Sequence, residues 1–198
     1  HPDANNEVIR VVEAEGCEAV VPGLAAFILN GMATADWNWQ TYGIKTGRRG
    51  RNLVRRFLEW YQRPVVDALT EGRIFDAPIP IMELAKKASQ VVSLGNQAGE
   101  GWLLTAEMIE LIETGTPNII CTQPFACLPN HVTGKGVFRE LRHRYPQANI
   151  VGVDYDPGAS PVNQLNRIKL MISAARRRRI PQIEQSSERA ISISADRT

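Results

Sequence analysis

The sequence predicts an α/β protein with a parallel, Rossmann-like sheet flanked by helices and a mainly helical middle segment. Short apolar runs rich in β-branched residues, at 17–21, 118–121 and 149–154, indicate buried strands. They alternate with longer stretches whose apolar residues recur every three or four positions, as in helices. This alternation is typical of a parallel sheet. The middle, residues 24–115, is mostly helical in pattern and is expected to be an insertion or a cap on the sheet.

Composition places few limits on function. The chain has 198 residues, 43% of them hydrophobic, and a net charge of +2, which is too small to indicate a nucleic-acid or membrane partner. No apolar run approaches the ~20 residues that span a bilayer. Three cysteines form an odd set in a chain of this size, which favours reduced thiols and a cytoplasmic location. Because the chain begins at His1, we interpret it as a fragment of a longer protein.

The first predicted elements are a helix and a strand. Asn5 or Asn6 can cap a helix that runs to Glu15, with Gly16 as the C′ residue. The run 17–21 then reads as a strand, closed by a Pro-Gly pair.

Three helices are expected in the part of the middle segment before residue 95. The first covers 24–30, and the aromatic stretch 36–42 after it has no clean periodicity. A long helix is entered from Arg48 and should kink or end at Pro64. A third helix is expected over 81–94.

Three further helices are predicted in the second half. Residues 102–113 form an amphipathic pattern, and another helix stops before Pro146. Ser160 is a suitable N-cap for a last helix through Arg176. These elements would form one α/β domain over residues 1–180. The polar, aperiodic residues 181–198 are expected to be a disordered tail.

The loop after the strand at 118–121 is the predicted ligand site. Parallel strands present their carboxyl ends to ligands, so we expect Cys127 at the mouth of a cleft there, near His131. A thiol in such a loop can ligate iron or zinc or act as a nucleophile, whereas an inert buried cysteine is the alternative. His131 is a candidate ligand or second-shell hydrogen-bond partner.

Two neighbouring features are candidate parts of this site. Cys121 is a second candidate metal ligand, but its position inside a strand favours packing, and its spacing from Cys127 matches no zinc or ferredoxin motif. Gly134, Lys135 and Gly136 are expected to start a helix, whose free N–H groups could hold a phosphate or carboxylate.

Three long motifs stand out: GEGWLLTAEM at 99–108, QPFACLPNH at 123–131, and DYDPGAS at 154–160 followed by NQLNR at 163–167. They resemble the benzoyl-CoA reductase / 2-hydroxyglutaryl-CoA dehydratase family. They are most similar to the C-terminal dehydratase-like part of large CoA-substrate-specific enzyme activases, the activators of (R)-2-hydroxyglutaryl-CoA dehydratase. The start of the chain is similar too, so the resemblance covers roughly Pro2 to Ala175.

The resemblance implies iron–sulfur electron chemistry. Members hold a [4Fe–4S] cluster through cysteines on α/β lobes, and a separate ATP-hydrolysing activase delivers a low-potential electron. The cysteine of the QPFACLPNH motif matches a cluster ligand, so that role falls on Cys127. Few hydrogen bonds to its sulfur would keep the potential low. ATPase motifs are absent from this sequence, so we expect no ATP hydrolysis by the chain itself.

Two hypotheses of function remain. The first is a redox module: the cluster-bearing part of a larger protein, which works with upstream ATPase (activase) domains of the same or another chain and with a 2-hydroxyacyl-CoA dehydratase subunit. The [4Fe–4S] cluster is expected in the full-length protein, and the fragment alone is not expected to hold a complete one. The second is a cluster-free interaction domain that docks an activase or a dehydratase.

Overall fold

The computed structural model describes residues 2–72 and 74–195, with side chains up to Arg178. The described chain forms two compact units, and each unit combines separated segments. The first takes the described parts of His1–Ala19, Asn118–Phe125 and Asn149–Thr198. The second takes Val20–Pro117 and Ala126–Ala148.

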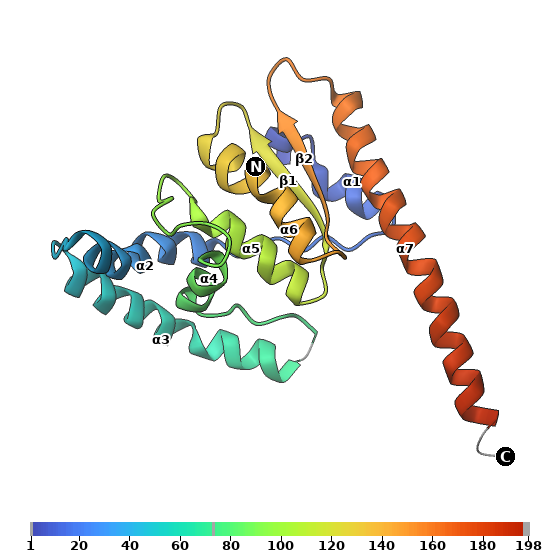
Figure 1. Cartoon of the computed structure of the whole chain (residues 1–198), viewed down its shortest axis with the longest axis horizontal. Helices are drawn as coiled ribbons and strands as arrows, with labels where there is room; N and C mark the ends of the chain where they lie inside the picture. The colour runs from blue at the N-terminus through green and yellow to red at the C-terminus, as the bar shows by residue number, and fades with distance from the viewer. Residues whose placement is uncertain (1, 73, 196–198) are drawn as a thin grey trace. The chain divides into compact units, whose positions relative to one another are not determined.

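The first unit is built on a two-stranded parallel sheet. Strands β1 (Asn118–Pro124) and β2 (Asn149–Tyr155) pair in a register that sets Ile119 opposite Ile150 and Cys121 opposite Gly152. Two helices belong to this unit and share its core, α1 (Val8–Ala14) and α7 (Pro161–Ala195), with the short 3₁₀ helix η1 (Pro2–Asn5) before them (Figure 1). The buried members of that core are Val8, Val153, Ile168, Met171 and Ile172.

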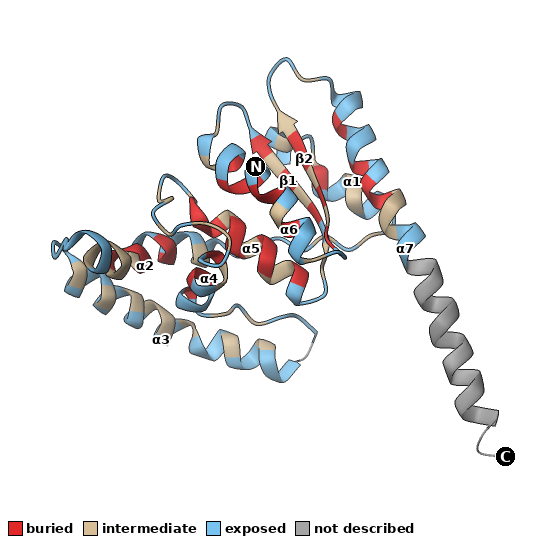
Figure 2. Cartoon of the chain, in the orientation of Figure 1, coloured by how far each residue is buried: buried red, intermediate tan, exposed pale blue. Residues whose placement is uncertain are grey.

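The second unit is helical. Its core is formed by apolar side chains of α2, α4 and α5, among them the fully buried Trp102 and Ala106 (Figure 2). The elements are α2 (Leu24–Tyr42), α3 (Arg48–Gly72), α4 (Ile81–Ala88), α5 (Trp102–Glu113), the π-helical turn η2 (Asn130–Gly134), the 3₁₀ turn η3 (Lys135–Val137) and α6 (Phe138–Arg144).

The coarse fold prediction is confirmed: the chain is mixed α/β, mostly helical, with a small parallel sheet. Helix α5 covers the predicted residues, and α7 starts at Pro161, where the N–H groups of Asn163 and Gln164 point to the carbonyl of Ser160. Gly16 follows α1 with φ of 71°, the left-handed conformation predicted for a C′ residue.

The predicted strand over 17–21 is wrong. This segment has no regular structure, and the side chains of Val20 and Val21 are exposed. The β-branched run resembled a strand, but it has no neighbouring strand to pair with, and Cys17 only packs beside the core of the first unit. The described chain therefore contains two paired strands rather than the three that were predicted.

Helix lengths in the second unit also differ from the predictions. Helix α2 continues through the aromatic stretch to Tyr42, because that stretch contains no glycine or proline after Gly31. Helix α3 runs on past Pro64 to Gly72, so of the two outcomes predicted for Pro64, a kink or an end, the end does not occur. Helix α4 ends at Ala88, six residues earlier than predicted, and turns fill the interval to the glycine loop.

At the other end of the chain, α7 continues to Ala195, beyond the predicted end at Arg176. The side chains after Arg178 and residues 196–198 lie outside the described part, and the disorder expected for residues 181–198 stays a prediction. A helix both long and apolar enough to cross a membrane does not occur in the described chain.

Candidate functional site

The Cys127 loop (residues 126–134) carries the predicted thiol. Its first residue, Ala126, has φ of 54°, a left-handed conformation that costs a non-glycine residue roughly 1 kcal/mol or more. Cys127 follows as a half-buried free thiol. The side-chain amide of the buried Asn130 donates a hydrogen bond to its Sγ at 3.1 Å. Backbone strain and an amide donor thus converge on one sulfur atom.

The His131 ring lies in the same turn. Its Nδ1 is 2.8 Å from the carbonyl oxygen of Cys127, which also accepts the backbone N–H of His131 at 3.3 Å. A carbonyl oxygen only accepts hydrogen bonds, so Nδ1 carries a hydrogen, and in the neutral ring the lone pair is then on Nε2. Because the side chain is exposed, Nε2 is open to a ligand.

Buried hydroxyl groups fix this loop to the glycine loop before α5. The Oγ1 of Thr133 lies 2.6 Å from the carbonyl oxygen of Gly101 and 2.9 Å from that of Pro129, and its single hydrogen is shared between them. The Oγ1 of Thr105 donates to the carbonyl of Thr133 at 2.7 Å. Both threonines are almost fully buried. Thr133, two residues beyond the 123–131 motif, therefore links that motif, through Pro129, to the 99–108 motif, through Gly101 and Thr105.

Gly101 makes this junction possible. Its φ is 52°, and a Cβ at this position would lie 2.0 Å from the carbonyl oxygen of Asn96. That carbonyl accepts the N–H of Trp102 at 2.8 Å, which closes the turn into α5. Only glycine fits here, since a side chain would break the turn.

The expectation that Gly134, Lys135 and Gly136 begin a helix is wrong. Helical turns already start at Asn130, as the π-helical η2, and pass directly into η3 and α6. The N–H of Lys135 consequently points to the carbonyls of Asn130 and His131 rather than to a ligand. These three residues still follow the Cys127 loop directly, and π-helical turns are frequent at functional sites.

The predicted ligands are divided between the two units. Cys121 is buried in β1 of the first unit, whereas Cys127 and His131 belong to the second, so neither unit holds both thiols. Among the described residues, no three His, Cys, Asp or Glu side chains gather closely enough to hold a metal ion. The predicted place of Cys127 at a cleft beside the strand ends remains a prediction.

Glu107 is a candidate that the sequence prediction missed. Burial, together with the nearby negative charge of Glu100, raises the pKa of its carboxyl group to about 7. A carboxyl group that titrates near neutral pH can accept and return a proton. The available signal was its position, because it is an acidic residue within the strongly apolar pattern of α5.

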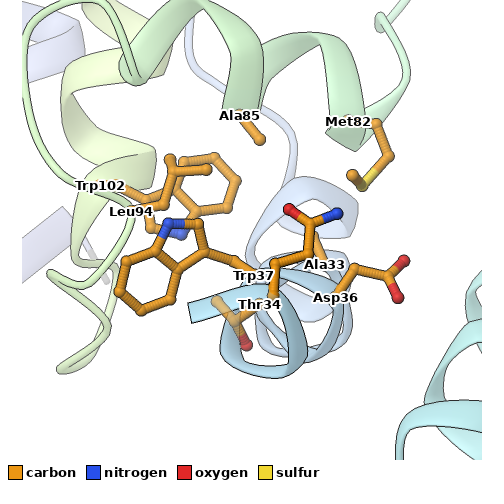
Figure 3. A pocket seen from close by; sticks show the side chains of 9 residues that line it. Ala33, Thr34, Asp36, Trp37, Met82, Ala85, Leu94 and Trp102 are labelled. Carbon is orange, nitrogen blue, oxygen red and sulfur yellow. The ribbon is translucent and has the colours of Figure 1, made fainter. Parts of the chain in front are cut away.

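A small pocket lies elsewhere in the second unit. Its volume is about 90 Å³, and mostly apolar residues of α2, α4, α5 and the intervening loop line it, including Trp37, Met82 and Trp102 (Figure 3). The carboxylate of Asp36 points away from the two indole rings and binds Arg48 and Asn52. The lining does not include Cys127 or His131, so this pocket is separate from the candidate site.

Comparison of the chain with protein-family models, with curated proteins and with solved structures found no match.

Proposed function

We propose that this chain is part of a larger iron–sulfur protein related to 2-hydroxyacyl-CoA dehydratase and its activator, and that Cys127 is a cluster ligand for low-potential electron transfer. The observation that carries the proposal is the Cys127 loop. A strained residue, a half-buried free thiol and a buried amide donor meet there, and the hydroxyl of Thr133 links two family-like motifs. Strain and partial exposure of a thiol are features of functional cysteines.

The residues present fit only part of a cluster. A [4Fe–4S] cluster usually takes four thiolates, and the second unit offers one, with the Nε2 of His131 nearby as a further donor. When bound, the cluster would supply one-electron redox chemistry. This chain would place one sulfur of the cluster and donate the side-chain N–H of Asn130 to it, and that hydrogen bond would partly offset the low potential. The remaining ligands would come from another part of the protein.

The wider fold and the partners belong to the same proposal. Strands β1 and β2 would be part of a larger Rossmann-like sheet, since parallel sheets are usually covered on both faces and contain more strands. The partners would be upstream ATPase (activase) domains and a 2-hydroxyacyl-CoA dehydratase subunit in the cytoplasm. The chain itself would hydrolyse no ATP.

The test is anaerobic purification of the full-length protein with assays of iron, sulfide and visible absorption. Cys127→Ala should lose most of the iron, while Cys17→Ala, which changes a thiol beside the core of the first unit, should keep it. Equal iron and equal spectra in both variants would make Cys127 a structural residue.

The alternative is a cluster-free interaction domain that docks an activase or dehydratase. The shortage of metal-binding side chains favours this alternative, because no group of three such side chains forms within the described residues. Absence of iron and sulfide from the anaerobic wild-type protein, together with a stable complex with either partner, would support this alternative.

A further inference from the structure

Helix α3 turns its apolar side toward solvent. Its exposed apolar residues lie on one arc of the helix, and none of its residues is buried (Figure 2). Trp60 is 60% exposed and Tyr61 70% exposed, and both contact the ring of Phe57. We call this surface the α3 apolar face, and it consists of Leu53, Val54, Phe57, Trp60, Tyr61 and Val65.

Polar contacts hold the helix in this orientation. The half-buried side of α3 is rich in polar residues, and there the Nε of Arg48 donates to Asp36 of α2 at 2.6 Å. Asn52 donates to the same carboxylate, and these hydrogen bonds lower the pKa of Asp36. Arg55 pairs with Glu59 on the same side at 2.8 Å. Of the apolar residues in the first four turns, only Leu58 packs against the core.

An aromatic cluster left in water loses the free energy that burial would give. Fully burying one side chain such as Phe or Leu contributes about 1.5–3 kcal/mol. A helix that exposes several of them on one arc has the pattern of an interface, since scattered single residues would need no explanation. The face is rich in aromatic residues and is bordered by arginine but no lysine, which is the composition of protein–protein interfaces.

Charge indicates what covers this face. Arg49, Arg56 and Arg63 are all exposed and spaced seven residues apart, so they form a row along one edge of the face. On the other edge Arg51 is also exposed. A partner helix would meet positive charge along most of the face, and acidic side chains would complement it.

Two other occupants fit less well. In an antiparallel dimer, the α3 helices of two copies of this chain would pack through the aromatic cluster. Arg56 of one copy would then lie beside Arg63 of the other, which places like charges together. An anionic membrane would attract the arginines, but Asp67 and Glu71 continue the same exposed side and would be repelled.

We propose that the α3 apolar face docks an amphipathic helix of a partner protein or domain, whose apolar stripe is bordered by aspartate or glutamate opposite Arg49, Arg56 and Arg63. This proposal does not depend on an iron–sulfur role for Cys127.

The experiment uses two synthetic helices of the same length as α3 and with the same leucine stripe. One carries glutamate along the edge of the stripe and the other lysine. The wild-type chain should bind the glutamate helix at least about tenfold more tightly near physiological ionic strength. The variant R49E/R56E/R63E should reverse this preference. A control with the same change in charge at exposed sites elsewhere, K86E/R139E/R177E, should keep it.

The apolar part of the proposal has its own variant. Trp60→Ala should weaken binding of the glutamate helix about tenfold or more, with an unchanged circular dichroism spectrum, because the residue is 60% exposed in the free chain. Binding to anionic phospholipid vesicles tests the membrane alternative, and sedimentation velocity tests whether the chain forms a dimer. Binding to vesicles without discrimination between the helices, a dimer that Trp60→Ala dissociates, or no binding to either helix would each overturn the proposal.

Discussion

The Cys127 loop and helix α3 belong to the same unit but distribute their polar groups in opposite ways. In the loop, the hydroxyls of Thr105 and Thr133 are buried and hydrogen-bonded, and their bonds fix backbone around one sulfur. In α3, polar side chains face α2 while aromatic rings such as Trp60 face water. The loop is stabilised by its own internal hydrogen bonds, whereas α3 exposes a surface that we propose binds another molecule or domain. Substitutions in the two regions should therefore have different consequences.

The largest effect is expected at Gly101. Gly101→Ala places a methyl group against the Asn96 carbonyl and requires a left-handed alanine, so we expect a loss of more than about 3 kcal/mol of unfolding free energy. Gly31→Ala in α2 is the matched control, because its Cβ meets open space, and it should stabilise by up to about 1 kcal/mol. Urea unfolding measures both, and equal stabilities would contradict the geometry of the loop.

Thr133→Val tests the hydroxyl bridge. Valine has nearly the same shape but leaves the carbonyls of Gly101 and Pro129 without their donor, at a cost of about 1–3 kcal/mol. The exposed Thr70 of α3, whose hydroxyl donates only to the carbonyl of Val66, is the control, and Thr70→Val should change stability by less than about 0.5 kcal/mol. Hydrogen exchange should also rise at the amide of His131 in Thr133→Val alone.

The pH dependence of stability tests Glu107. Its pKa is raised, mainly by burial, from 4.5 to about 7, so the folded state binds this proton more tightly than the unfolded state. Its contribution is complete below pH ~4.5, falls as pH rises towards about 7, and then stays constant, with a span on the order of 2 kcal/mol after allowance for partial exposure.

Glu107→Gln should remove this dependence and be more stable than the wild type at pH 8. Thermal unfolding of the wild type and of Glu107→Gln from pH 4 to pH 8 measures the difference in their stability. Glu100→Gln should shift the transition partway to lower pH, because it removes the second cause of the raised pKa. A wild-type profile that is flat between pH 5 and pH 7 would rule out the raised value.

The smallest effect on stability is expected on α3. Phe57→Ser should change the unfolding free energy by less than about 0.5 kcal/mol, because its side chain is more than half exposed and its aromatic contacts lie on the same exposed arc. Asp36→Asn, on the opposite side, should cost about 1–2 kcal/mol, because it weakens the bonds to Arg48 and Asn52. If Phe57→Ser were the more damaging of the two, α3 would pack in the reverse orientation.

Local signals in the sequence predicted the local structure well. Helix α5 has an apolar periodicity between glycines, which defines both of its ends, and the β-branched runs of β1 and β2 were sufficient to identify them. Ser160 and Pro161 predicted the start of α7 in the same way.

What failed depended on contacts that are distant in sequence. The run around Val20 looked like a strand, but a strand needs a neighbour, and the sequence does not say whether one is available. The orientation of α3 follows from the carboxylate of Asp36, which lies in another helix. The hydroxyl bridge of Thr133 joins residues some thirty positions apart. The sequence therefore predicted the thiol of the site but not the hydrogen bonds that hold its loop in place.

The division of the chain into segments has a consequence for folding kinetics. The polypeptide passes between the two units four times, after residues 19, 117, 125 and 148, so neither unit is a continuous fragment. Helix α1 shares its core with β2 and α7, which are separated from it by the whole of Val20–Pro117 and more. Such distant contacts slow folding, because a long loop must close before they form. During synthesis on the ribosome, α1 is made well before α7, so it cannot be buried in this core until α7 has followed.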